Sequence, residues 1–578
     1  MKVFRHSILL LFALLCGLQG QAQQQRFFNL TVDDIAIDTM LPRFSYAIPL
    51  GKHYADSIYT LEIRYPEFLE MGRRDSLRYL ALAPSADPGR LPEIEQHIVV
   101  DRKKGRLDFS LCPVVRREGR LQFLVSFMIA VTSQPKPSLK APSHAGTQRD
   151  LTSSEDAAIY AKHSVLREGR WVKIRVPESG IYQLTSQLAR QAGFSDLSRV
   201  RIFGYGGNLQ NEELHKGDLA ATDDLPEVAS TMIGDRRLFY AKGPVSWENK
   251  EATRRTRNPY SDYGYYFLTE TDGKTPLMVD SAQFIADCYP LADDYHALRE
   301  VDNFSWYQGG RNLFENDPIE QGKSRTYVFS HPAGENRMAN LTIAVTAGAA
   351  ASVQYRLNGK DLGNASLRLS SYNAAVEAEN TYKIECTASD TITVTTLSGG
   401  PVRMDYISYA YERPKPQPRL ATDPFPVPEY VYAITNQDHH AAPQADLVII
   451  IPTSQKLRPQ AERLAQMHRD RDSMRVNIVP ADELYNEFSS GTPDANAYRR
   501  YLKMLYDRAG DDEAQMPKYL LLFGDAVWDC RMLTPECRSL NADDYLLAHE
   551  SENSFSETDC YVNDGWICLL YTSPSPRD

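Results

Sequence analysis

The stretch LVIIIPTSQKLRPQAERLAQMHRDRDSMRVNIVP at residues 447–480 decides the fold of the C-terminal part of the chain. Its first five residues are an unbroken aliphatic run, which is typical of a parallel strand buried on both faces. Pro459 suits the first turn of a helix, and Val476 with Ile478 indicates a second strand. The helix between them carries an apolar stripe with helical spacing, formed by Ala461, Leu464, Ala465 and His468. We interpret His468 as a histidine packed at the edge of the core.

The next residues extend the same pattern. A longer amphipathic helix begins after Thr492-Pro493-Asp494 and ends at Gly510, and Tyr519 to Phe523 form a third buried strand. The predicted order strand, helix, strand, helix, helix, strand is the start of a parallel sheet covered by helices. Ser489-Ser490-Gly491, between the last two helices, is interpreted as a turn with capping hydroxyls, because the strand–serine–helix arrangement of a nucleophile elbow is missing.

Two carboxylates stand where such a sheet binds its ligands. Ligands of open parallel sheets lie beyond the carboxyl ends of the strands, and Asp525 and Asp529 directly follow the third strand. They are candidate site-wall residues, able to bind a cation or to orient a base. The alternative for Asp525 is that it accepts hydrogen bonds from backbone N–H groups in the turn. The sequence decides neither for nor against a metal ion here.

Other reactive side chains give weaker signals. His439 and His440 precede the first strand without a cysteine or serine nearby, and we expect both at the surface. Cys530 is followed by one further histidine, His549, so a Cys530–His549 dyad rests on chain order alone. Cys530 and Cys537 are close enough to bridge a loop in an oxidising compartment, and two free, inert thiols are the equal alternative.

The chain before residue 429 alternates apolar and polar residues over short runs, which predicts strands. The glycine cluster at residues 204–207 lacks the spacing of a dinucleotide-binding motif and is predicted to be a tight turn. Asn358-Gly359 predicts a hairpin, because both residues tolerate a positive φ. We therefore expect β-rich N-terminal regions of the sandwich or jelly-roll kind. The second of them is expected to bury its own core without help from the residues beyond the proline-rich segment.

The N-terminus and the composition suggest an exported protein of several domains. Lys2 and Arg5, the apolar run 8–18 and the small residues around Ala22 have the layout of a signal peptide cleaved after Ala22. A net charge of −11 argues against nucleic acid as a partner. The expected segments are a signal peptide 1–22, an N-terminal β-rich domain 23–132, a linker 133–162, a β-sandwich-like domain 163–412, a proline-rich linker 413–428, a truncated α/β domain 429–567 and an artefactual tail 568–578.

Eight short motifs occur along the chain in a fixed order: GIY at 180–182, NPYSDY at 258–263, YYFL at 265–268, MDYI at 404–407, NQD at 436–438, LYNEFSSG at 484–491, KMLYDRA at 503–509 and YLLLFGD at 519–525. With these motifs the chain resembles the type IX secretion sortases of Bacteroidetes, whose α/β catalytic domain is similar to those of caspases and gingipain-like cysteine peptidases. The resemblance covers roughly Arg170 to Asp559 and is strongest in the last hundred residues.

The resemblance implies a surface cysteine endopeptidase and transpeptidase. Such an enzyme removes the C-terminal sorting domain of secreted cargo and joins the new carboxyl end to a surface glycolipid. The family uses a histidine in a Thr-Gly-His-Gly segment and a cysteine one strand later, and this sequence contains neither motif. No catalytic residue is therefore carried over, and the chain of 578 residues is expected to be an inactive fragment. A gingipain-like protease that only hydrolyses, or a non-catalytic β-sandwich docking module, are the alternatives.

The resemblance also implies partners and a location. The partners are cargo proteins with C-terminal sorting domains, other outer-membrane components of type IX secretion and the glycolipid acceptor. The location is the outer membrane or the cell surface. No cofactor is implied, although the full-length family domain can accommodate a structural calcium ion.

Overall fold

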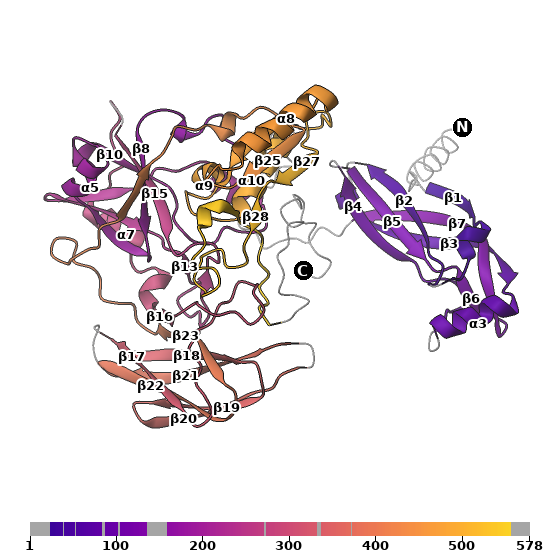
Figure 1. Cartoon of the computed structure of the whole chain (residues 1–578), viewed down its shortest axis with the longest axis horizontal. Helices are drawn as coiled ribbons and strands as arrows, with labels where there is room; N and C mark the ends of the chain where they lie inside the picture. Colours follow the sequence, from indigo (N-terminus) through magenta and orange to yellow (C-terminus); the bar gives the residue numbers. More distant parts are fainter. Residues whose placement is uncertain are drawn as a thin grey trace, which may run out of the picture. The chain divides into compact units, whose positions relative to one another are not determined.

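The computed structural model describes residues 24–555, except 39, 52–53, 84–86, 102–103, 136–158, 271–272, 332–336 and 371–372. The chain forms two compact units, residues 1–149 and 150–578 (Figure 1). The expected signal peptide and the expected artefactual tail lie outside the described residues. Within the described ranges, no helix combines the length and the apolarity that a membrane crossing needs.

The first unit contains two antiparallel sheets that share one core. The core is formed by inward-facing side chains of both sheets, among them Phe28, Ile48, Phe109 and Phe127. The ring of Phe28 packs against that of Phe127 with centroids 5.4 Å apart. One sheet has the order β1 (Gln24–Asn29), β7 (Arg120–Pro135), β3 (Ser57–Glu70), with β6 (Val114–Arg117) also on β7. The other has the order β2 (Phe44–Gly51), β5 (Lys104–Leu111), β4 (Glu95–Asp101), and the helices are α2 (Val32–Ile35) and α3 (Arg73–Leu82).

The second unit begins with two further antiparallel sheets that share a core around Val172, Ile174 and Phe239. The first sheet has the order β10 (Val200–Phe203), β15 (Gly264–Glu270), β8 (Trp171–Val176), β24 (Glu429–Ala433). The second has the order β11 (Ser230–Ile233), β12 (Arg236–Ala241), β9 (Gly180–Leu184). The short elements of this region are α5 (Ser186–Gln191), α6 (Lys216–Ala221), α7 (Ser281–Cys288), β13 (Val245–Ser246) and β14 (Thr256–Arg257).

A β-sandwich of two four-stranded antiparallel sheets follows in the same unit. Apolar side chains from both sheets, including Leu341, Val353 and Ile407, form its core. Asn358 and Gly359, with φ of 51° and 81°, join β19 to β20 as the predicted hairpin. The sheets have the orders β16 (His296–Glu300), β23 (Val402–Tyr411), β18 (Arg337–Ala347), β21 (Val376–Cys386) and β17 (Ser324–Ser330), β22 (Ser389–Gly399), β19 (Ala351–Leu357), β20 (Lys360–Leu367).

The C-terminal region has the predicted parallel α/β order (Figure 1, in orange and yellow). Its central strand, β25 (Leu447–Ile451), is completely buried, as its aliphatic run predicts. β27 (Tyr519–Leu522) differs from the prediction: Tyr519 is 55% exposed, because β27 pairs only with β25 among the described strands. The remaining elements are α8 (Arg458–Asp472), β26 (Val476–Pro480), α9 (Ala481–Phe488), α10 (Asn496–Arg508), β28 (Asp525–Ala526) and β29 (Tyr545–Leu546).

The α/β region and the preceding β region share structure across the proline-rich segment 413–428. β24, which comes after that segment, pairs with β8 of the preceding sheet. Tyr160 and Tyr260 belong to the same buried cluster as the side chains of α9 and α10. The Tyr160 hydroxyl donates to Asp507 Oδ2 at 2.8 Å. The two core clusters of the β region are formed by its own residues, as expected, but the region also shares a strand pairing and a buried cluster with the α/β region, which the sequence did not indicate.

Candidate functional site at the carboxyl end of the parallel sheet

A loop that returns over the sheet closes part of its carboxyl edge. β28 continues the chain after β27 and pairs in parallel with β29. The Ser454 N–H, just after β25, donates to the Asp543 carbonyl at 2.8 Å. Lys456 Nζ lies 2.6 Å from Asp544 Oδ2. Gly524 is required here, because a Cβ at this position would lie 2.7 Å from Pro452 Cγ.

The two predicted site-wall carboxylates have different environments. Asp525 is exposed, and its Oδ1 accepts a hydrogen bond from the Ala526 N–H at 2.9 Å. Asp529 is buried, and its Oδ2 accepts from the N–H groups of Leu533 and Thr534, both at 2.7 Å. Asp529 Oδ1 makes no hydrogen bond within the described residues. Both side chains therefore cap turns, and the structure does not bring them onto a common ligand.

A buried lysine and a carboxylate at this edge have pKa values that are shifted toward neutrality. Lys173 comes from β8, and its Nζ donates to Asn486 Oδ1 of α9 at 3.1 Å and lies 4.5 Å from the centre of the Tyr265 ring. Burial lowers the pKa of Lys173 to about 8, against the attraction of Asp482 and Asp543. Burial raises the pKa of Asp482 to about 6, and the charge of Lys173 opposes this. Groups whose pKa is shifted toward neutrality are typical of functional sites.

His440 is the main correction to the predicted site residues. It is completely buried, whereas the sequence predicted a surface histidine. Its Nδ1 lies 2.6 Å from Glu487 Oε2, and its Nε2 lies 3.2 Å from Asp223 Oδ1. Burial favours the neutral ring, but the hydrogen bonds to Asp223 and Glu487 outweigh burial and raise the pKa of His440 to about 10.

His439 is also more enclosed than predicted. The ring Nε2 of His439 lies 2.6 Å from Glu483 Oε2, and the backbone N–H of His439 donates to Glu487 Oε1 at 2.8 Å. His468 is half-buried on α8, close to the predicted core-edge position, and its Nδ1 contacts Asp472 Oδ2 at 2.7 Å. Each of these three histidines therefore contacts a carboxylate, and none of the contacts given for them within the described residues is to a thiol.

The described cysteines are Cys112, Cys288, Cys386, Cys530 and Cys537, and all five are free thiols. The predicted alternative of a Cys530–Cys537 disulfide is therefore wrong. Burial raises the pKa of each thiol, to about 11 for Cys288 and about 12 for Cys386. Cys530 Sγ donates to the Val527 carbonyl at 3.5 Å, while His549 Nε2 lies 3.6 Å from Glu212 Oε1. The geometry does not support a Cys530–His549 dyad.

Sequence reasoning missed Lys173 and the partners of His440. Lys173 has the pattern of an ordinary outward position of an alternating strand, and the helix that buries it lies more than 300 residues later. Asp223 and Glu487 lie 217 and 47 residues from His440 in the sequence. No local signal was available for His440, because its burial depends on Asp223 and Glu487, which other segments supply.

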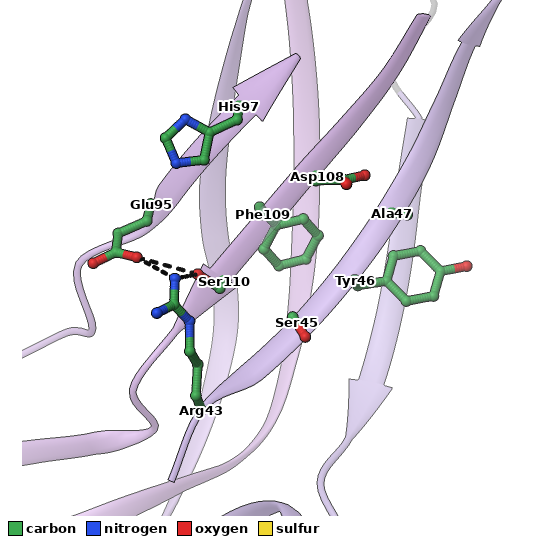
Figure 2. A pocket seen from close by; sticks show the side chains of 9 residues that line it. All are labelled: Arg43, Ser45, Tyr46, Ala47, Glu95, His97, Asp108, Phe109 and Ser110. Atoms are coloured by element: carbon green, nitrogen blue, oxygen red, sulfur yellow. Dashed lines mark hydrogen bonds and ion pairs between the residues drawn. The ribbon is translucent and has the colours of Figure 1, made fainter. Parts of the chain in front are cut away.

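A hollow of about 370 Å³ lies on the first unit (Figure 2). Its polar groups are paired with one another: Arg43 Nη2 lies 2.5 Å from Glu95 Oε2 and 2.8 Å from Ser110 Oγ. Phe109 belongs to the core of this unit, and Tyr46 is covered by the guanidinium of Arg26 at 4.5 Å. The ion pair and the aromatic contacts stabilise the sheet, and we assign the hollow no catalytic role.

Residues 440–566 match the family model described as Peptidase family C25. The chain is similar to a solved structure described as dimeric latent PorU from Porphyromonas gingivalis, with 26% identity and a TM-score of 0.61. The match covers 73% of this chain and 48% of that one, so the chain spans about half the length of that structure.

Two smaller solved proteins show a more limited similarity. A family 35 carbohydrate-binding module from Clostridium thermocellum is 16% identical, with 20% of this chain and 87% of the module covered and a TM-score of 0.14. The module CBM36 in complex with calcium and xylotriose is 14% identical, with 20% and 98% covered and the same TM-score. These scores are too low to carry an argument. No curated protein sequence matches the chain. The match to peptidase family C25 thus falls on the parallel α/β region described above, and residues 440–566 are termed the peptidase domain.

Proposed function

We propose that the chain serves in a cysteine endopeptidase and transpeptidase of the sortase kind. Such a protein removes the C-terminal sorting domain of secreted cargo and transfers the new carboxyl end to an amine of a surface glycolipid. The observation that carries the proposal is the family C25 domain at residues 440–566 in a chain 26% identical to PorU. The signal-like segment 1–22 supports export and a place at the outer membrane or cell surface.

The chemistry requires a thiolate that attacks the peptide carbonyl. The acyl-enzyme that forms is then resolved by an amine in transfer or by water in hydrolysis. Burial keeps the described thiols protonated near neutral pH, because it raises the pKa of every one of them. We therefore propose that the nucleophile is none of these five cysteines. Because the sequence also lacks a Thr-Gly-His-Gly segment, we propose that the 578-residue chain alone has no peptidase activity.

The inactivity is tested with the purified chain of 578 residues and a fluorogenic peptide from a cargo C-terminal segment. We expect no thiol-dependent cleavage, since loss of the nucleophile typically costs several orders of magnitude in rate. Cys530→Ala and Cys537→Ala are the matched variants. Cleavage by the unmodified chain that disappears in one of them would identify that cysteine as the nucleophile and overturn this part of the proposal.

The sortase function itself is tested by deleting the gene in the producing organism and analysing secreted cargo by mass spectrometry. We expect cargo from the deletion strain to keep its C-terminal sorting domain. Cargo from the parent strain should carry a glycolipid on its new carboxyl end. A free carboxyl end in the parent strain would instead indicate a protease that only hydrolyses. Unchanged cargo in the deletion strain would favour a docking module without catalysis.

A further inference from the structure

Three metal-ligating side chains meet at one end of the β-sandwich 296–411. His331 directly follows β17, Cys386 ends β21, and Asp390 lies in β22. One ligand atom from each residue lies within 4.8 Å of those of the other two. All three side chains are buried, with exposures of 2%, 1% and 0%. They lie in the β-sandwich, outside the peptidase family domain.

One nitrogen in this cluster faces only the carboxylate. His331 Nδ1 is 2.6 Å from the Tyr411 hydroxyl. His331 Nε2 lies 3.2 Å from Asp390 Oδ2 and has no other partner within the described residues. An imidazole nitrogen and a carboxylate oxygen are both ligand atoms for a metal ion, so an ion held between the three side chains would take the place of this single contact.

The carboxylate is held in position by its other oxygen. Asp390 Oδ1 accepts hydrogen bonds from Asn358 Nδ2 at 2.8 Å and from Thr387 Oγ1 at 2.7 Å. Asp390 Oδ2 faces His331 and accepts a hydrogen bond from the Tyr409 hydroxyl at 3.3 Å. The carboxylate is thus held by the turn between β21 and β22 and by the hairpin at Asn358.

We propose that His331, Cys386 and Asp390 form a structural zinc site. A sulfur, an imidazole nitrogen and a carboxylate oxygen are the donor types that Zn²⁺ takes in proteins, and three protein ligands leave one position for a water molecule. The contact between His331 Nδ1 and Tyr411 has the role of the outer hydrogen bond that orients a metal-bound histidine. On binding, the ion replaces the proton of the Cys386 thiol, which is released to solvent.

The ion would connect the two sheets of the sandwich. Cys386 belongs to the sheet of β16, β23, β18 and β21, whereas Asp390 belongs to the sheet of β17, β22, β19 and β20. The guanidinium of Arg337 acts on the same cluster electrostatically. It lies 4.3 Å from the centre of the Tyr411 ring and donates to the Arg413 carbonyl. Arg337 is therefore engaged outside the ligand set.

The test is a titration of the chelator-treated, full 578-residue chain with Co²⁺, which replaces Zn²⁺ and reports a thiolate ligand by a near-ultraviolet charge-transfer band. We expect the band to saturate at about one ion per chain and to disappear when Zn²⁺ is added. Zinc should also raise the melting temperature, and a chelator should reverse that rise. The absence of a saturable band in the unmodified chain would overturn the proposal, and a purely hydrogen-bonded polar cluster would remain.

Matched variants locate the site. Cys386→Ser should abolish the near-ultraviolet band, and His331→Gln should weaken Co²⁺ binding at least about tenfold. Cys288→Ser and Cys530→Ser remove other buried thiols of the same unit and should leave the band unchanged. A band that survives Cys386→Ser, or that is lost in Cys530→Ser, would place the metal elsewhere. If Cys386→Ser fails to fold, His331→Gln and the unmodified chain decide the question.

Discussion

At the scale of single residues, His440 is a positive charge placed in the core between two carboxylates. Its ring stacks on Phe488 with centroids 4.6 Å apart, and its two nitrogens contact Glu487 and Asp223. The contact between His440 and Asp223 joins the start of the peptidase domain to the loop after α6. A buried ion pair costs desolvation, and removal of one partner leaves the other charge buried without compensation.

Replacing His440 should therefore destabilise the second unit strongly. We expect His440→Gln to lower its free energy of unfolding by at least about 3 kcal/mol at pH 7. The pKa of His440 is about 10 in the folded protein and about 6.5 when unfolded. Its contribution is therefore complete below about pH 6.5 and is lost as the pH rises through about 10. Denaturant unfolding of both proteins between pH 6 and pH 10 measures whether the difference narrows.

The control is His468→Gln on the partly exposed face of α8. This histidine contacts Asp472 one turn along the same helix. An exposed pair of this kind contributes less than about 1 kcal/mol, so the variant should unfold nearly as the parent does. Equal losses in the two variants, or a His440→Gln effect that grows at high pH, would contradict the charged, buried state of His440.

At the scale of elements, two turns hold the peptidase domain against the preceding sheet. Ser490 Oγ, between α9 and α10, accepts hydrogen bonds from the N–H groups of Tyr205 at 2.9 Å and Gly206 at 3.2 Å. The same hydroxyl donates to the Tyr265 carbonyl at 3.0 Å. Gly204 has a φ of +128°, and a Cβ there would lie 2.6 Å from Ser490 Oγ. The predicted capping hydroxyl thus caps the predicted glycine turn, across nearly 300 residues of sequence.

This contact predicts a difference between two glycine substitutions. Gly204→Ala forces a positive φ on a side chain and also drives its Cβ into Ser490, so we expect a loss of about 2–4 kcal/mol. Gly234→Ala also has a positive φ, +61°, but its Cβ would meet no atom within 4 Å. We expect Gly234→Ala to lower the free energy of unfolding by about 1 kcal/mol. Denaturant unfolding of both variants measures the difference, and equal losses would show that the turn contact is unimportant.

The elements themselves were largely predictable because their signals are local. The aliphatic run of β25, the helix start at Pro459 and the hairpin at Asn358 depend on neighbouring residues, and the structure confirms all three. The exposure of β27 was not predictable in this way, because an apolar run has the same appearance at the edge of a sheet and at its centre. Whether a strand has one neighbour or two is decided by distant parts of the chain.

At the scale of the whole molecule, Arg531 ties the peptidase domain to the regions that precede it. Its side chain is almost completely buried, with Nη1 at 2.9 Å from Asp262 Oδ1 and Nη2 at 2.6 Å from Asp302 Oδ2. Arg257 contacts the same two carboxylates at 3.0 Å and 3.1 Å. These ion pairs join residues that come before the proline-rich segment 413–428 to a residue that comes after it. The two parts of the second unit are therefore packed against each other.

Cleavage of that segment should therefore leave the two parts associated. We expect a protease site inserted after the exposed Gln417 to be cut without releasing the peptidase domain in native buffer. Co-elution in gel filtration measures this, and separation should need denaturant. In Arg531→Ala the cut fragments should separate at a lower denaturant concentration, because Asp262 and Asp302 lose a buried partner. Immediate release from the unmodified protein would show that the two parts are independent.

The candidate site was less predictable than the fold, because its residues come from segments that are far apart in the sequence. Asp525 and Asp529 were found because they come after a strand in the sequence, and the structure places them at that strand end. Lys173 and Asp482 could not be found in this way, since they come together only when β8 packs on α9. Chemistry that is assembled from distant segments leaves no local pattern.

The contact between Tyr160 and Asp507 has a consequence for the order of folding. Synthesis proceeds from the N-terminus, so the first unit can close as soon as its own strands have appeared. The second unit has to wait until α10 has been made, because its first described residues pack against that helix. Until then, Tyr160 and Tyr260 lack the side chains of α9 and α10 with which they form one buried cluster, and they stay open to unproductive association. We therefore expect its refolding to be slow and concentration-sensitive, as is usual where most contacts are distant in sequence.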